Sequence, residues 1–351
     1  MKIHLRKFSY MSLKIKNNRL VNIEILRIIA MLLVLFGHYV IPYYGNVTQE
    51  MVRYDLFKAI SIAGSKSLSF VCVPSFVIIS GYFGIHWKWK SLANYLFQIA
   101  FWGGFIYLLT LLLGMHNFSA FKFLQHIFCS MWGVNWFFSA YLGVYMLAPI
   151  INAYVEKSTE KELLWMVLAF FCFQTFYGWI IKIDELRDGL TTTSLLGYYL
   201  LGAYLKRTTL KCFHLDAKTN MLVFLGIGLF CMALNCATQY IGFKKDVYSY
   251  ISPLQVLQTA YLFLFCKSLK VRNGKIANVI LFLSSSAFAG LLMHTWEGAE
   301  MYYKVLDYIQ DHFSFSVILS LLWILIFFIL ACFLDKIRIW VYNGTLLKLF
   351  K

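Results

Sequence analysis

The sequence has few charged residues, and this scarcity excludes an ordinary soluble domain. Only 14% of its 351 residues are charged, whereas 60% are hydrophobic, and the mean hydropathy is +0.68. A soluble domain is closer to one quarter charged and one half apolar. The apolar residues form long runs, which is typical of a protein that crosses a membrane several times.

Familiar catalytic and metal-binding motifs are missing as well. The eight cysteines form no Cys-x-x-Cys pair, so neither a disulfide framework nor a zinc site is indicated. The sequence contains no Gly-x-Ser-x-Gly elbow, no P-loop, no Rossmann fingerprint and no His-Glu-x-x-His motif. We therefore expect neither a bound metal ion nor nucleotide hydrolysis.

A cleavable signal peptide, internal repeats and low-complexity linkers are also absent. The basic stretch 1–19 leads directly into an apolar run, with no small-residue cleavage site after it. We expect a single integral-membrane domain over residues 1–351, with a cytoplasmic basic segment at 1–21 and a cytoplasmic tail at 336–351.

Ten apolar runs are candidates for membrane-spanning helices. They are 22–43, 64–85, 92–114, 134–153, 162–182, 191–206, 220–241, 252–270, 278–297 and 314–335. The sixth run is short and contains Gly197 and Gly202. Residues 121–132 and 298–313 are more polar and are expected to form non-spanning segments. The predicted fold is an all-α polytopic bundle of about ten transmembrane helices.

The basic residues indicate how this bundle is oriented. The chain has 32 Lys and Arg against 16 Asp and Glu, a formal net charge of +16. The gaps on the N-terminal side of the membrane contain more than twice as many Lys and Arg as the opposite gaps. The positive-inside rule then predicts a multi-pass membrane protein with both termini in the cytoplasm. Attraction to anionic membrane lipids accounts for the charge without a nucleic-acid partner.

The first run carries a polar stripe, formed by Glu24, Arg27 and His38. Eleven positions separate Arg27 from His38, which is three helical turns plus about 20°, so both lie on one face about 16 Å apart. Glu24 lies near the same stripe, three positions before Arg27. Charged residues in a spanning helix are costly and are usually kept for a function. This stripe is therefore the first candidate for a catalytic site.

His38 and Arg27 suit different parts of a reaction. A neutral imidazole accepts a proton from a hydroxyl near neutral pH and can return it to a leaving group, so His38 is the candidate base. Arg27 offers a planar fork of donors for phosphate or carboxylate. A structural histidine and an internal Arg27–Glu24 ion pair are the competing interpretations, and the second is compatible with a binding role.

Other segments add candidate residues. Lys88 and Lys90, in a basic-aromatic turn expected in the cytoplasm, would either clamp phosphate or anchor the interface. At the outer ends of two spans, aromatic and polar side chains would either bind an acceptor or serve packing. These are Trp136, Tyr141, His294 and Glu297.

In this order the motifs resemble the membrane acyltransferase family 3. The resemblance covers nearly the whole chain and rests on four elements: Arg27-x10-His38 with Glu24 before it; Phe76…Ser80-Gly81-Tyr82 followed by a basic turn; Trp136…Tyr141…Pro149; and Leu292-Met293-His294. Many members have an Arg-x-x-Arg pair in the first cytoplasmic loop, where this chain has Lys88 and Lys90. They often have Pro where this chain has Thr295.

The resemblance implies an O-acyltransferase in a bacterial-type plasma (inner) membrane. The donor would be a cytoplasmic acyl-CoA, usually acetyl-CoA, and the acceptor a hydroxyl of a cell-surface polysaccharide or lipid-linked glycan. His38 would be the base or a transient acyl carrier, Glu24 would orient Arg27, and Arg27 would bind the donor. No soluble hydrolase-like domain is expected after the last span.

Two other functions remain open at this stage. A transporter or flippase for a glycan intermediate would use the polar stripe as a translocation path. A membrane sensor or scaffold would contain a purely structural histidine. The sequence leaves the acyl group, the acceptor and the oligomeric state open, a homo-oligomer included.

Overall fold

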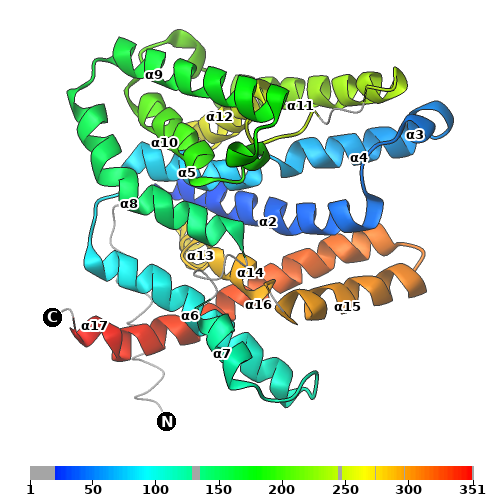
Figure 1. Cartoon of the computed structure of the whole chain (residues 1–351), viewed down its shortest axis with the longest axis vertical. Helices are drawn as coiled ribbons and strands as arrows, with labels where there is room; N and C mark the ends of the chain where they lie inside the picture. The colour runs from blue at the N-terminus through cyan, green and yellow to red at the C-terminus, as the bar shows by residue number, and fades with distance from the viewer. Residues whose placement is uncertain (1–19, 129–134, 244–246, 273, 296, 350–351) are drawn as a thin grey trace.

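The described residues form helices and contain no β-strand, as the sequence predicts (Figure 1). The computed structural model describes residues 20–349 except 129–134, 244–246, 273 and 296. The α-helices are α2 (Val21–Tyr44), α3 (Gln49–Tyr54), α4 (Leu56–Ser69), α5 (Cys72–Phe83), α6 (Trp89–Leu112), α7 (Ala120–Ile127), α8 (Trp136–Lys157), α9 (Glu160–Phe173), α10 (Thr192–Arg207), α11 (Ala217–Tyr240), α12 (Pro253–Ser268), α13 (Lys275–Ser284), α14 (Phe288–Met293), α15 (Glu297–His312), α16 (Ser316–Gly344) and α17 (Leu346–Leu349). The shorter segments are the π-helical η1 (Gln174–Ile181) and the 3₁₀-helical η2 (Asp184–Gly189) and η3 (Lys211–Phe213).

Among the described residues, seven helices are long and apolar enough to cross a membrane. They are Val21–Tyr44, Leu56–Phe83, Trp89–Leu112, Trp136–Lys157, Glu160–Ile181, Ala217–Tyr240 and Ser316–Gly344. These correspond to seven of the ten runs in the sequence. The expected sixth, eighth and ninth spans are shorter helices: α10, α12 and the pair α13–α14. The predicted segment 1–21 lies almost wholly outside the described residues, and the single-domain organisation stays a prediction.

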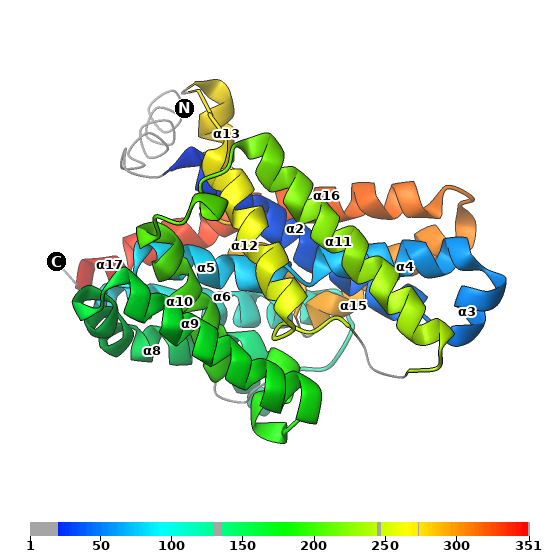
Figure 2. The ribbon, with the colours of Figure 1, turned by 90° about the horizontal axis from the view of Figure 1, so that it is seen from above.

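Helix α2, which carries the polar stripe, is the central helix of the bundle. It packs against α4, α5, α12, α13, α14 and α16. Figures 1 and 2 show α9–α12 on one side of it and α6, α15 and α16 on the other. This shielding is what a charged stripe requires, because an Arg facing lipid would be costly.

Helix α10 is short but continuous, and its glycines serve close packing rather than a break. It has 16 residues and packs against α5, α8 and α9. A Cβ atom at Gly202 would overlap the carbonyl oxygen of Ile78, and one at Gly81 would overlap that of Tyr199. Glycine at both positions therefore lets the α5 and α10 backbones touch.

Gly81→Ala is expected to destabilise the protein by about 1–3 kcal/mol, because the added methyl group has no space between the two backbones. Gly226→Ala on α11 is the matched control, since a Cβ there meets no atom within 4 Å. The measurement is the thermal unfolding temperature of each purified variant in detergent. Equal unfolding temperatures for both variants would contradict the close-packing role of Gly81.

The expected ninth span, 278–297, is not one helix. Helix α13 ends at Ser284 and α14 begins at Phe288, so a short non-helical turn lies between them. The Lys336 ammonium on α16 donates to the carbonyl oxygen of Phe282 (2.8 Å) and to the hydroxyls of Ser285 and Ser286 (2.9 Å each). Irregular backbone inside a membrane protein is tolerated where protein groups satisfy it or where it lines a cavity.

The two segments expected not to span the membrane are short helices. Helix α7 has 8 residues and begins after Ser119, whose hydroxyl accepts from the Lys122 backbone N–H. Helix α15 has 16 residues and packs against α16 and α6. Residues 129–132 of the first expected segment lie outside the described part of the chain.

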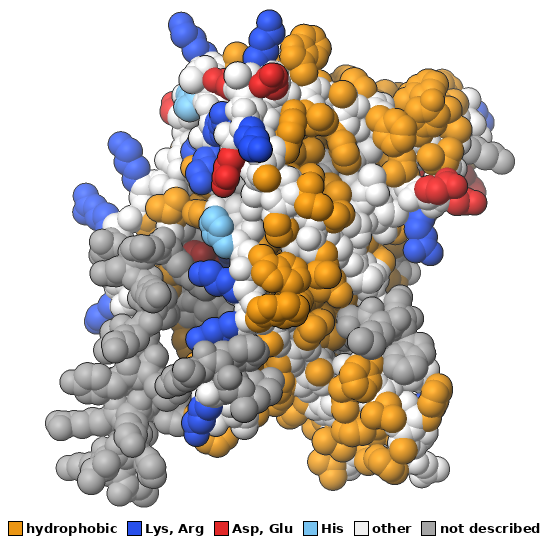
Figure 3. All heavy atoms as spheres, turned by 60° about the vertical axis from the view of Figure 1, so that its left-hand side comes forward, with side chains coloured by type: hydrophobic (Ala, Val, Ile, Leu, Met, Phe, Trp, Pro, Cys, Tyr) orange, Lys and Arg blue, Asp and Glu red, His pale blue; other side chains and the backbone are white. Residues whose placement is uncertain are grey.

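Basic side chains gather at one end of the bundle. Figure 3 shows Lys and Arg over the side that lies at the left of Figure 1, and hydrophobic side chains over the neighbouring surface. A band of exposed apolar residues is typical of contact with lipid, and helices α9, α11 and α16 all contribute to it. The separation of the two surfaces agrees with the charge asymmetry of the sequence.

Candidate active site

The polar stripe of α2 begins with an ion pair near the N-terminal end of that helix. The Arg27 guanidinium Nε lies 3.6 Å from the Glu24 carboxylate Oε2. The Glu24 side chain is only 5% exposed, whereas that of Arg27 is 33% exposed. The guanidinium therefore keeps donors free of this pair, since Arg has five N–H groups. Glu24 contacts Arg27 but does not line the cavity described next, so its predicted role in orienting Arg27 stays a prediction.

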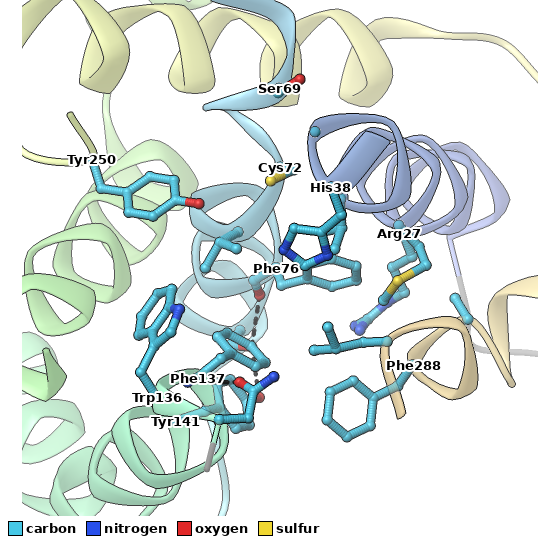
Figure 4. Close-up of a pocket in the computed structure, with 18 of the residues that line it drawn as sticks. Arg27, His38, Ser69, Cys72, Phe76, Trp136, Phe137, Tyr141, Tyr250 and Phe288 are labelled. Carbon is cyan, nitrogen blue, oxygen red and sulfur yellow. Dashed lines mark hydrogen bonds between the residues drawn. The ribbon is translucent and has the colours of Figure 1, made fainter. Parts of the chain in front are cut away.

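A single cavity of about 470 Å³ follows the stripe (Figure 4). Its α2 lining runs from Arg27 to Ile41, about 21 Å along the helix axis. The lining residues are Arg27, Met31, Val34, Gly37, His38 and Ile41 of α2; Ser69, Phe70, Cys72, Val73, Phe76 and Ser80 of α4, α5 and their junction; Tyr95 and Gln98 of α6; Asn135, Trp136, Phe137 and Tyr141 at the start of α8; Tyr250; and Ser284, Ser285, Ala287, Phe288 and Leu291. Arg27 and His38 thus share one cavity.

Helix α15 holds the backbone of α2 at His38. Pro42 lies within α2 and has no N–H, so the carbonyl of His38, four residues earlier, lacks its usual helical donor. The Tyr303 hydroxyl donates to that carbonyl (2.8 Å). The Tyr302 hydroxyl donates to the Leu35 carbonyl (3.0 Å). Three residues therefore fix the position of His38: Pro42, Tyr302 and Tyr303.

The imidazole of His38 stacks on a second imidazole. Its ring centroid lies 4.6 Å from that of His294, with 17° between the ring planes. His294 follows the last residue of α14 and meets the Tyr302 ring edge to face at 4.9 Å. Within the described part of the chain, His38 Nδ1 and both nitrogens of His294 have no hydrogen-bond partner. The two rings therefore contact each other face to face, with nitrogens that no described residue occupies.

Aromatic rings form the opposite wall of the cavity. Trp136 stands 5.9 Å from Tyr250, and Phe70 stands 5.3 Å from the same ring, measured between centroids. Tyr141 shares a hydrogen bond of 2.9 Å with Ser80. Figure 4 shows Trp136 and Tyr141 of α8 facing the same space as His38 of α2. Such rings suit the faces of a sugar and also exclude water from the cavity.

Four predicted site residues do not line this cavity. Glu24 and His294 each contact a residue that does. Lys88 and Lys90 have exposed side chains and do not line it; their backbones bond with the Tyr145 and Tyr342 hydroxyls. The side chain of Glu297 lies outside the described atoms, so its predicted role stays a prediction.

Several lining residues escaped the sequence reasoning. Gln98, Ser284 and Ser285 are polar residues inside apolar runs, and that contrast could have identified them. Cys72 and Tyr250 gave no such signal, because cysteine and tyrosine are common in spanning helices and their ends.

The arrangement can bind an anion at one end and move a proton at the other. Arg27 supplies a permanent positive charge, and His38 supplies a base about 16 Å away along α2. In the described ranges, no group of three or more His, Cys, Asp or Glu side chains could hold a metal ion.

Comparison with known proteins identifies the family. A family model described as an acyltransferase domain matches residues 20–335. No curated protein and no solved structure gives a significant match. The match includes α2 to the late part of α16, and with them every residue of the cavity. The chain therefore belongs to the acyltransferase family 3 of multi-pass membrane proteins.

Proposed function

We propose that this membrane acyltransferase moves an acetyl group from cytoplasmic acetyl-CoA to a hydroxyl of a cell-surface polysaccharide or lipid-linked glycan. The observation that carries the proposal is the single cavity that contains both Arg27 and His38. Its length along α2, about 21 Å, is most of the hydrocarbon thickness of a bilayer.

The donor enters from the end of the bundle nearer Arg27. The first residues of α2 and the last residues of α16 lie at this end, and basic side chains gather there (Figure 3). Under the positive-inside rule this end faces the cytoplasm of a bacterial-type plasma membrane. A guanidinium binds phosphate oxygens with paired hydrogen bonds, so Arg27 receives the phosphates of the donor.

The acceptor enters from the other end and meets His38. The imidazole takes the proton of the acceptor hydroxyl as its oxygen attacks the thioester carbonyl. The carbon–sulfur bond then breaks, and the thiolate of coenzyme A leaves and recovers the proton. The apolar and aromatic lining keeps water from competing with the acceptor. Trp136 and Tyr141 offer ring faces to a sugar.

The test is mass spectrometry of surface glycans from cells with and without this protein. Alkali-labile acetyl esters are expected only in cells that contain it, because an ester bond is the product of the transfer. A liposome assay without acyl-CoA is the control. Movement of a glycan intermediate across those liposomes, together with unchanged glycan acetylation, would favour the flippase and overturn the proposal.

A further inference from the structure

Gln98 is a buried residue whose carboxamide has no partner among the described residues. It lies on α6, is 8% exposed and lines the same cavity as Arg27 and His38. No hydrogen bond joins its carboxamide to another described residue. A carboxamide that lines a cavity and bonds with no described residue is available to a ligand in that cavity.

Contacts on α16 indicate the depth of Gln98 in the membrane. The Trp102 indole on α6 donates to Asp335 (3.1 Å), and the next residue, Lys336, donates to Ser285 in the turn between α13 and α14. Trp102 and Ser285 are therefore at similar depth. Gln98 precedes Trp102 by one helical turn. It thus lies near the level of the turn between α13 and α14, where Ser285 lines the same cavity as Arg27.

Other polar groups in this part of the cavity are already engaged. The Ser285 hydroxyl donates to the Phe282 carbonyl (2.8 Å) and accepts from Lys336. The Tyr95 hydroxyl, one turn from Gln98, donates to the Phe138 carbonyl (2.9 Å). Gln98 differs from them because neither its N–H donors nor its carbonyl bonds with a described residue.

We propose that Gln98 binds an amide group of the pantetheine arm of the acyl donor. The inference rests on the proposed function, because it requires an acyl-CoA in the cavity. The arm carries two amides between its sulfur and its first phosphate. With the thioester at His38 and the phosphate at Arg27, the amides pass the part of the cavity that Gln98 lines. A carboxamide matches them with one donor and one acceptor and adds no charge.

The experiment compares wild type, Gln98→Met and Gln98→Asn with four acetyl donors. Methionine keeps the length of the side chain but loses its hydrogen bonds, and asparagine keeps the amide on a shorter chain. The donors are acetyl-CoA, S-acetylpantetheine, S-acetyl-N-acetylcysteamine and S-ethyl thioacetate, which contain two, two, one and no amides. For Gln98→Met we expect KM to rise about tenfold with both pantetheine donors and to stay unchanged with S-ethyl thioacetate. For Gln98→Asn we expect a smaller rise in KM than for Gln98→Met, because the amide is kept.

The pattern across donors separates two failures. If KM of Gln98→Met rises by the same factor with all four donors, or rises with none, the role of Gln98 is overturned while the proposed function is left intact. A wild-type protein that uses none of the thioesters would instead overturn the proposed function. An effect with S-acetyl-N-acetylcysteamine assigns the contact to the amide nearer the sulfur, and its absence assigns it to the farther amide.

Discussion

Replacing His38 by alanine is expected to lower acyl transfer by about 10²–10⁴-fold, because a positioned general base contributes that much to the rate. The variant removes the ring that stacks on His294 and faces the cavity. The hydrogen bond from the Tyr303 hydroxyl should survive, because it goes to the backbone carbonyl of residue 38 and not to the side chain. The rate is measured with acetyl-CoA, and membrane insertion is measured from the same preparation.

His312→Ala is the matched control for this variant. His312 has an exposed side chain on α15, where its ring stacks on Tyr308. It should therefore leave the rate unchanged. Near-normal transfer by His38→Ala at normal protein levels would show that His38 is not the base. A loss that accompanies reduced insertion would show that the stacked pair is structural, which is the competing interpretation of this histidine.

The long spans were predictable because each is a continuous apolar run with polar ends. The predicted 22–43 and 220–241 match α2 (Val21–Tyr44) and α11 (Ala217–Tyr240) closely. The last span was predicted to end at 335, yet α16 continues to Gly344. The apolar run ends at the charged residues Asp335, Lys336 and Arg338, but the helix does not end there.

The structure explains why α16 continues past its first charges. The Asp335 carboxylate accepts from the Arg338 guanidinium (2.7 and 2.9 Å) and from the Trp102 indole, and Arg338 also donates to Asn94. Both charged side chains are buried, Asp335 completely. Pairing across α6 and α16 offsets the cost of burying them. Such pairing depends on which helices are neighbours, and a hydropathy pattern does not contain that information.

The same limit applies to the candidate site. Arg27 and His38 share one helix, so helical spacing alone predicted that they lie on one face of it. The stack of His38 on His294 and the exposure of Gln98 to that cavity depend on how α14 and α6 pack around α2. The turn between α13 and α14 likewise requires Lys336 from α16. Local residue patterns predicted what lies on one helix, and packing decides what meets between helices.

Replacing Arg27 by glutamine is expected to raise KM for acetyl-CoA by about 30-fold or more, because the phosphates would lose a charged partner in a partly buried site. Arg27→Lys should recover only part of this loss, since a lysine ammonium cannot bind phosphate with a planar fork. The substitution also removes the ion-pair partner of Glu24 at 3.6 Å. The double variant Glu24→Gln/Arg27→Gln therefore separates loss of donor binding from the effect of the altered carboxylate.

S-acetylpantetheine makes the test specific, because it contains the thioester and both amides but no phosphate. If Arg27 binds phosphate, Arg27→Gln should raise KM very little with this donor, so that wild type and variant have nearly the same KM for it. Arg53→Gln is the control for a lost positive charge, since Arg53 lies on α3 against the Tyr240 ring, away from the cavity. An equal penalty with both donors would mean that Arg27 supports the fold of α2 through Glu24. The donor phosphates would then have to bind elsewhere at the basic end of the bundle, where Lys88 and Lys90 become the next residues to replace.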